Sequence, residues 1–396
     1  MKINRNTLII FFLASFFACS QEESVISSEE KTLTYFDAPS DSAAVVNSEK
    51  LDYIADTVAT ELENPWGMAF LPDGSMLITE RPGRLRMIKD GKLLPKEITG
   101  VPEVFAEGQG GLLDVALHPD FASNSLIYLS YSAKGEGGSN TAVMRAKLEG
   151  NALTNQEVIF QATPFTEKNY HFGSRIEFDN DGYMYVTVGD RGERDTNPQS
   201  LESFCGKVHR LYDDGKIPED NPFVNKEGAV ASIYSYGHRN LQGLAKHPVT
   251  GEIWEHEHGP QGGDEVNIIK AGANYGWPVI SYGINYDNTI LTEDTAKAGM
   301  EQPMHYWDPS IAPCGMAFVT SDKYPDWKNN LLVGSLKFRY LARCEVQDGK
   351  VVHEEKILDT MGRVRAVEQA PDGYIYVAME SPGLLVRVFP AKKADQ

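Results

Sequence analysis

The fold is decided by a strand-turn-strand unit whose first copy reads Pro65-Trp66-Gly67-Met68-Ala69-Phe70-Leu71-Pro72-Asp73-Gly74 and then Met76-Leu77-Ile78-Thr79-Glu80. An apolar strand is followed by a Pro-Asp-Gly turn, and the turn by a second strand of mostly aliphatic residues. The unit is therefore read as a pair of β-strands joined by a sharp turn.

The same unit recurs five more times along the chain. Its later first strands start with Gly111-Leu112-Leu113, Gly173-Ser174-Arg175, Asn240-Leu241-Gln242, Gly315-Met316-Ala317 and Val364-Arg365-Ala366. Their spacing is irregular, roughly 45 to 75 residues, close to or above the period of a four-stranded propeller blade. Helical periodicity is nearly absent, and 35 Gly and 21 Pro supply turns. We predict an all-β chain with one six-bladed β-propeller over residues 51–392; a β-sandwich or a parallel β-helix needs no paired unit of this length.

The charge of the chain limits its partners. The 396 residues carry a formal net charge of −19, with a pI near 4.9. A broad basic face for DNA or RNA is not expected on such a surface. An acidic surface favours solubility and divalent cations, and it leaves room for a local basic pocket.

The N-terminus has the pattern of a targeting segment. Lys2 and Arg5 precede an apolar run over residues 8–17, which is too short to span a bilayer comfortably, and Ala18-Cys19 follow. We expect residues 1–18 to be a lipoprotein-type signal peptide and residues 19–50, rich in Ser, Glu, Asp and Ala, a disordered tether. The protein would then be exported to the periplasm or cell envelope and held by a lipid on Cys19; a plain secretory signal is the alternative.

Polar residues gather where the predicted first strands begin, and in a propeller those loops form one face. His171 precedes the third unit and is the best candidate for a base, because a neutral imidazole accepts a proton near neutral pH. Asp190, which follows the next strand, is suited to orient it. Gln109 lies in a Gly-rich turn before the second unit. A structural histidine, a turn aspartate and a plain tight turn are the alternatives for these three.

Basic and amide residues occupy similar positions. They are Arg239, Asn240, Lys337, Arg363 and Arg365. The last two alternate on one strand and so share a face. Each cation alone fits a solvated surface, but four in so acidic a chain imply a small ligand with several negative oxygens.

The loop after the fourth unit reads His258-Gly259-Pro260-Gln261-Gly262-Gly263-Asp264-Glu265, with Tyr275 soon after. Exposed backbone carbonyls next to paired carboxylates are the mixture that calcium prefers, although an acidic loop would look the same. His256 and His258 would share a strand face as in a zinc site, but no third ligand is evident.

Eight motifs occur together and in order: GQGGLL, YHFGSRIEF, GDRG, YGHRNLQGL, EHGPQGGDE, NYGWP, SLK and GRVR. In combination they resemble the soluble PQQ-dependent glucose and aldose sugar dehydrogenases, over residues 64–388. The compact loops are closer to the aldose sugar dehydrogenase branch. The resemblance implies a six-bladed propeller that carries pyrroloquinoline quinone (PQQ) and Ca²⁺, oxidises aldose sugars at C1 to lactones and passes electrons to an external acceptor.

The resemblance also implies roles for the residues. His171 would take the proton of the sugar C1 hydroxyl while hydride passes to PQQ, and Asp190 would assist it. The carboxylates and quinone oxygens of PQQ would be held by Gln109, Arg239, Asn240, Lys337, Arg363 and Arg365. The carbonyls of Gly259 and Pro260 would bind the calcium beside PQQ, and Asp264, Glu265 and Tyr275 match a second, structural calcium.

Two residues depart from the family pattern, and two other functions are alternatives to the dehydrogenase. Cys314 stands where the family commonly has a small hydroxyl residue, and Phe338 could narrow the sugar site. Cys205, Cys314 and Cys344 fit no zinc or redox spacing, so two could pair or all could be buried thiols. A calcium-dependent propeller hydrolase of the lactonase type shares the fold, as does a non-catalytic binding propeller. The lactonase has no use for four cationic side chains.

Overall fold

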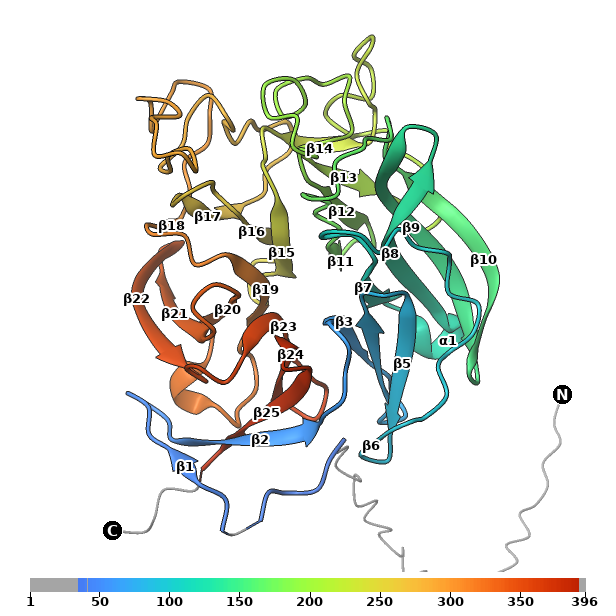
Figure 1. Cartoon of the computed structure of the whole chain (residues 1–396), viewed down its shortest axis with the longest axis vertical. Coiled ribbons are helices and arrows are strands. Elements are labelled where there is room, and N and C mark those ends of the chain that lie inside the picture. The colour runs from blue at the N-terminus through green and yellow to red at the C-terminus, as the bar shows by residue number, and fades with distance from the viewer. Residues whose placement is uncertain (1–34, 41, 392–396) are drawn as a thin grey trace, which may run out of the picture. The chain divides into compact units, whose positions relative to one another are not determined.

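Six antiparallel sheets form the blades of a ring around a central channel in the unit Leu33–Gln396 (Figure 1). The computed structural model describes residues 35–391 except residue 41. Blade 1 comprises β3 (Pro65–Phe70), β4 (Met76–Glu80), β5 (Arg84–Lys89) and β6 (Lys92–Leu93). Blade 2 comprises β7 (Leu112–Leu117), β8 (Leu126–Gly135), β9 (Gly138–Glu149) and β10 (Ala152–Gln161), with the short helix α1 (Phe121–Asn124) between β7 and β8. Blade 3 comprises β11 (Ile176–Phe178), β12 (Met184–Val188), β13 (Lys207–Leu211) and β14 (Ile233–Tyr236).

The remaining blades follow the same order. Blade 4 comprises β15 (Leu241–Lys246), β16 (Ile253–Glu257), β17 (Asp264–Ile268) and β18 (His305–Trp307). Blade 5 comprises β19 (Pro313–Phe318), β20 (Leu331–Ser335), β21 (Leu341–Gln347) and β22 (Lys350–Ile357), with a 3₁₀ turn at Pro325–Trp327. Blade 6 comprises β23 (Arg363–Gln369), β24 (Ile375–Ser381) and β25 (Leu384–Pro390), and is completed by β2 (Tyr53–Ala59) and β1 (Val45–Val46).

Each repeated unit of the sequence supplies the first two strands of one blade. In every blade, the first strand stands at one edge of the sheet and pairs with the next strand along the chain. These first strands are β3, β7, β11, β15, β19 and β23. The prediction of an all-β, six-bladed propeller is confirmed.

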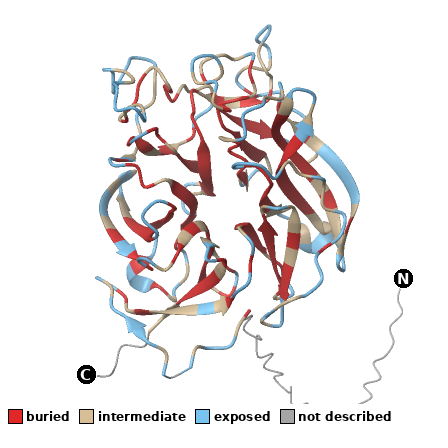
Figure 2. Ribbon diagram, viewed as in Figure 1, coloured by how far each residue is buried: buried red, intermediate tan, exposed pale blue. Residues whose placement is uncertain are grey.

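The apolar residues of neighbouring blades pack face to face. Each of six buried clusters joins two adjacent blades; for example, Leu77 and Leu85 of blade 1 pack with Leu112 and Ile127 of blade 2. Both faces of every blade are therefore covered by its neighbours, and Figure 2 shows the inner strands buried along most of their length, whereas outer strands such as β10 and β22 are partly exposed. This packing fixes the relative positions of the loops that begin the first strands.

The ring is closed by the N-terminal part of the chain. β2 pairs with β25 in antiparallel register, so Tyr53 lies opposite Pro390. The preceding segment is also packed: the hydroxyl of Tyr35 donates to the carbonyl of Leu71 at 3.0 Å, and Arg387 donates to the carbonyl of Phe36 at 3.0 Å. Residues 19–50 were expected to form a disordered tether. From residue 35 onward the structure differs from this expectation, because the aromatic side chains of this segment cover blades 1 and 6.

The other expectations for the N-terminus, a signal peptide over residues 1–18 and a lipid on Cys19, lie outside the described residues. Within residues 35–391, no helix has the length and apolar character needed to cross a membrane. Cys205, Cys314 and Cys344 are buried and form no disulfide.

Candidate active site

The centre of the site is a hydrogen-bonded pair of side chains from adjacent loops of blade 3. Nδ1 of His171 lies 2.7 Å from Oδ1 of Asp190. The side chain of Asp190 is 1% exposed and that of His171 13% exposed, so one edge of the imidazole reaches a cavity. No described residue hydrogen-bonds to Nε2 of His171. This nitrogen is therefore available to a ligand.

Both members of the pair are held from several sides. His171 has a left-handed backbone conformation, with φ of 57°, and its N–H donates to Oε1 of Gln109 at 2.8 Å. Asp190 accepts hydrogen bonds from the indole Nε1 of Trp277 at 2.9 Å and from the backbone N–H of Gly192 at 2.8 Å. Residues from blades 2, 3 and 4 thus orient one imidazole.

The surroundings keep the histidine neutral and the aspartate charged. Burial lowers the pKa of His171 below its usual value, and the charge of Arg239 adds to this, although the hydrogen bond to Asp190 opposes it. Burial alone raises the pKa of Asp190, but the hydrogen bond and charge of His171, with the charge of Arg239, hold it below its usual value. A neutral imidazole beside a carboxylate is the arrangement of a general base.

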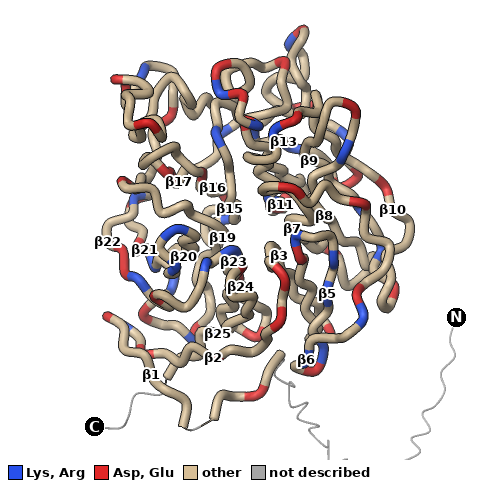
Figure 3. The backbone as a smooth tube through the Cα atoms, viewed as in Figure 1, with Lys and Arg blue, Asp and Glu red and all other residues tan. Residues whose placement is uncertain are grey.

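Next to this pair, the channel contains a basic cavity of about 370 Å³. The predicted residues Gln109, Asn240, Arg363 and Arg365 line it. Arg363 Nε lies 3.2 Å and Arg365 Nε lies 2.7 Å from the carboxylate of Glu380. Figure 3 shows positive residues on β23 beside the channel. The expected basic pocket is present, with one carboxylate that the sequence did not indicate.

An outer cavity of about 420 Å³ opens at the His171–Asp190 pair. It is lined by Gln109, which borders both cavities, and by Tyr170, His171, Asp190, Gly192, Arg194, Arg239, Pro260, Trp277, Asn285 and Tyr286. Of these, Arg194 donates to Asn285 at 2.8 Å, which joins two loops across the opening. The aromatic and amide residues here were not foreseen, because they lie in loops between units.

Arg239 and Lys337 differ in their placement. Arg239 is 6% exposed and donates to the carbonyl oxygens of His258 at 3.1 Å and Gly259 at 2.8 Å. It therefore organises the Gly-Pro loop. Lys337 is exposed, its Nζ lies 5.1 Å from the ring centre of Phe338, and it lines neither cavity. The structure does not bring Lys337 to the other predicted ligands.

Of the residues expected to bind a second calcium ion, Asp264 and Tyr275 already have hydrogen-bond partners within the protein. The carboxylate of Asp264 accepts hydrogen bonds from Gly259 N, Ser310 Oγ, Ile311 N and Ala312 N, so it holds the loops together. The hydroxyl of Tyr275 donates to the carbonyl of Ile268 at 2.6 Å.

A different cluster lies beside Glu265 on the same face of blade 4. Ligand atoms of His238, Glu255 and Glu257 lie within 4.8 Å of one another. Glu257 is paired with Glu265 and Glu255 with Asn267 across β16 and β17. Oε2 of Glu255 is buried and has no hydrogen-bond partner. An orphaned carboxylate oxygen among other buried carboxylates fits a cation.

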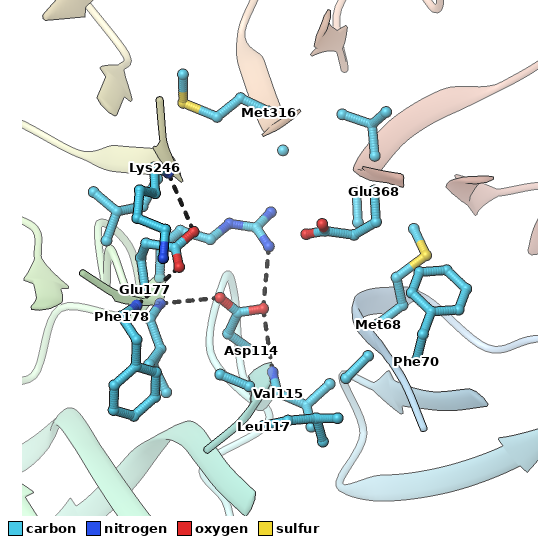
Figure 4. Close-up of a pocket in the computed structure, with 18 of the residues that line it drawn as sticks. Met68, Phe70, Asp114, Val115, Leu117, Glu177, Phe178, Lys246, Met316 and Glu368 are labelled. Carbon is cyan, nitrogen blue, oxygen red and sulfur yellow. Dashed lines mark hydrogen bonds and ion pairs between the residues drawn. The ribbon is translucent and has the colours of Figure 1, made fainter. Parts of the chain in front are cut away.

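The far part of the channel is acidic and contains none of the predicted site residues. A cavity of about 380 Å³ there is bordered by Asp114, Glu177, Lys246 and Glu368, as Figure 4 shows. Arg175 lies between the two parts of the channel. Its guanidinium donates to Asp114 at 3.3 Å and to the carbonyl of Arg365 at 2.9 Å, and it lies 3.9 Å from the ring centre of Trp66.

Several residues that line the basic cavity were not predicted from the sequence, namely Trp66, Arg81, Gln242 and Glu380. Two of these residues belong to blade 1: Trp66 lies at the start of its first strand, and Arg81 follows its second. Both could have been found by asking of every unit which residue begins the first strand and which ends the second.

Fold and site together define a class of protein: a propeller enzyme with a His–Asp pair at the edge of a basic channel cavity. The chain belongs to the glucose/sorbosone dehydrogenase family, whose family model matches residues 62–387. This confirms the family indicated by the sequence motifs and the prediction of an enzyme.

Relatives and solved structures agree with this family. The chain is 46% identical to the aldose sugar dehydrogenase YliI of Escherichia coli over 338 residues, 83% of this chain and 91% of the relative. It is 31% identical to quinoprotein glucose dehydrogenase B of Acinetobacter calcoaceticus, over 89% of this chain and 91% of that one. The apo crystal structure of the soluble aldose sugar dehydrogenase of E. coli matches with a TM-score of 0.82 at 41% identity, covering 86% and 100% of the two chains. A PQQ-bound aldose sugar dehydrogenase of Streptomyces coelicolor matches with a TM-score of 0.69 at 28% identity, covering 89% and 99%.

Proposed function

We propose that this protein is a PQQ- and calcium-dependent dehydrogenase that oxidises aldose sugars at C1 to lactones and passes the electrons to an external acceptor. The observation that carries the proposal is the oriented, neutral His171 in the outer cavity, which shares Gln109 with a neighbouring cavity lined by three guanidinium groups. The names of the relatives, an aldose sugar dehydrogenase and a quinoprotein glucose dehydrogenase, support the substrate and the cofactor.

In this proposal, Nε2 of His171 accepts the proton of the C1 hydroxyl. Asp190 keeps the imidazole proton on Nδ1 and stabilises the positive charge that develops when Nε2 is protonated. When bound, PQQ supplies the acceptor for the hydride of C1, and calcium polarises its quinone oxygen. The outer cavity then holds the rest of the sugar near Trp277 and Tyr286.

The basic cavity fits an organic polyanion. Arg81, Arg363 and Arg365 line it with only one carboxylate, Glu380, so it holds an excess of positive charge. Gln109 and Asn240 add amide groups for the quinone oxygens. Of the residues expected to hold PQQ, Arg239 acts through the loop at Gly259, and Lys337 is left out of the set.

Calcium is proposed at two places. The carbonyls of Gly259 and Pro260 would hold the ion beside the cofactor, since Pro260 lines the same cavity as His171. For the second ion, the orphaned oxygen of Glu255 favours a site formed by Glu255, Glu257 and Glu265. Asp264 and Tyr275 would instead support that site by fixing the surrounding loops.

Reconstitution tests the function. Purified protein loaded with PQQ and Ca²⁺ is assayed for dye reduction with a panel of aldoses, and the product is identified as lactone or acid. Sugar-dependent reduction that requires PQQ supports the proposal. Tight PQQ binding without turnover of any aldose would overturn it, and lactone hydrolysis without PQQ would point to a hydrolase.

A further inference from the structure

The backbone of Arg81 is fixed where blades 1 and 2 meet. Its N–H donates to the carbonyl of Asn64 at 3.1 Å, and its carbonyl accepts from the N–H of Leu112 at 3.0 Å. Gly111 approaches so closely that a Cβ there would lie 2.0 Å from the carbonyl oxygen of Arg81. Because Gly111 also has φ of 146°, only glycine fits this contact. The position of Arg81 therefore depends on Gly111, the second glycine of the Gly-Gly pair in the GQGGLL motif.

The side chain of Arg81 faces the basic cavity without a carboxylate partner. Its Nη1 donates to the carbonyl of Gly108, and none of the ion pairs among the described residues includes it. The next two arginines of the chain differ, since Arg84 and Arg86 lie 2.6 Å and 3.3 Å from Glu80. Arg81 is thus the arginine of this edge that forms no direct ion pair with a described carboxylate.

The other cations of the cavity are already partnered. Arg363 and Arg365 share Glu380, while the cavity has no second carboxylate. Burial lowers the pKa of Arg81; the charge of Glu380 opposes this, and the nearby charge of Arg365 adds to it. A half-buried guanidinium beside another cation gains most from an incoming anion.

From this arrangement, which rests on the proposed function, we propose that Arg81 is a direct ligand of an anionic group of the cofactor. A planar guanidinium held at one end by the Gly108 carbonyl retains its other N–H groups for a carboxylate. An anion that binds Arg363 or Arg365 must compete with Glu380, whereas one that binds Arg81 displaces no carboxylate. Blade 1 therefore contributes an anchor to the cofactor site, in addition to packing between blades 6 and 2.

The experiment measures PQQ binding without sugar. Quenching of tryptophan fluorescence, to which Trp66 in the cavity contributes, is followed in titrations of the wild type and of Arg81→Gln, Arg81→Lys and Arg84→Gln. Loss of a charged hydrogen-bond partner predicts an increase in Kd of about 10- to 100-fold for Arg81→Gln. Arg81→Lys should lie between this variant and the wild type, and Arg84→Gln should bind within about twofold of wild type.

Salt supplies a second readout. Because a charge is removed, Kd of Arg81→Gln should rise less steeply with NaCl than that of the wild type. Equal Kd and equal salt dependence for Arg81→Gln and wild type, with both proteins folded by circular dichroism, would overturn the inference while leaving the proposed function intact. Failure of the wild type itself to bind PQQ would overturn the proposed function instead.

Discussion

Trp277 and Asp190 are joined by a hydrogen bond of 2.9 Å from the indole Nε1 to Oδ2, which leaves Oδ1 for His171. Trp277 comes from the loop after β17 of blade 4, and Asp190 from blade 3. The bond therefore lets a contact between blades set the direction of the imidazole of His171.

Replacing Trp277 by Phe should keep most of the packing but remove this bond. Asp190 then loses a donor that fixes its rotamer, so we expect kcat to fall by about tenfold, with PQQ affinity little changed. Steady-state kinetics and PQQ titration measure both. The matched control is Trp307→Phe, whose indole donates to Glu354 at 2.7 Å outside both cavities of the site. A loss of kcat as large in the control would contradict the role given to Trp277.

Replacing His171 by Ala should separate chemistry from binding. Removal of a general base lowers turnover by about 10²- to 10⁴-fold, whereas the basic cavity still holds PQQ. Arg363→Ala should do the reverse and weaken cofactor retention first. Rates with saturating PQQ, together with Kd values, distinguish the two. Equal losses of turnover and retention in both variants would show that the roles are wrongly divided.

The pH dependence follows from the environment of His171. Asp190 faces it and raises its pKa, Arg239 and Arg191 lower it, and burial has the largest effect, so the pKa lies below 6.5. The active, neutral form then persists below pH 6.5, and kcat/KM should fall only in more acidic solution. In Asp190→Asn the pKa of His171 falls further, so the acid limb moves to lower pH while the rate at pH 7 decreases. A limb that moves to higher pH would contradict this electrostatic account.

The cluster around Glu255 predicts opposite effects of a substitution with and without calcium. Burial and the charge of Glu257 raise the pKa of Glu255 well above its usual value, so its charged form is disfavoured when no ion is bound. In the presence of a chelator, Glu255→Gln removes this acidic group and should raise Tm relative to the wild type. With calcium, the wild type gains stability by binding the ion and the variant gains less. Thermal unfolding in both buffers is the measurement. A calcium-dependent rise in Tm that is the same in both proteins would place the ion elsewhere.

The N-terminal expectation has a simple test. If residues 1–18 are a lipoprotein signal, Cys19→Ser should release the protein from the membrane fraction and abolish labelling by a fatty acid. Labelling that persists in the variant, or a wild type that is never labelled, would favour a plain secretory signal.

The fold could be predicted because every blade repeats one local pattern, and the turn in Pro72-Asp73-Gly74 marks it plainly. Closure by β2 could not, because its partner β25 lies more than three hundred residues away and the pairing has no local signal. His171 and Asp190 were found because each has a chemical type suited to one role. Glu380 and Arg81 were missed because their importance lies in which charges they face, and this depends on distances across the channel.

The most direct test of the central claim is the absorbance of the PQQ-loaded, calcium-loaded protein mixed with one equivalent of glucose or another aldose, without an electron acceptor. We expect bound PQQ to be reduced once per chain in the wild type, and about 10² to 10⁴ times more slowly in His171→Ala. Bound PQQ that no aldose reduces, or reduction at the same rate in both proteins, would contradict the central claim.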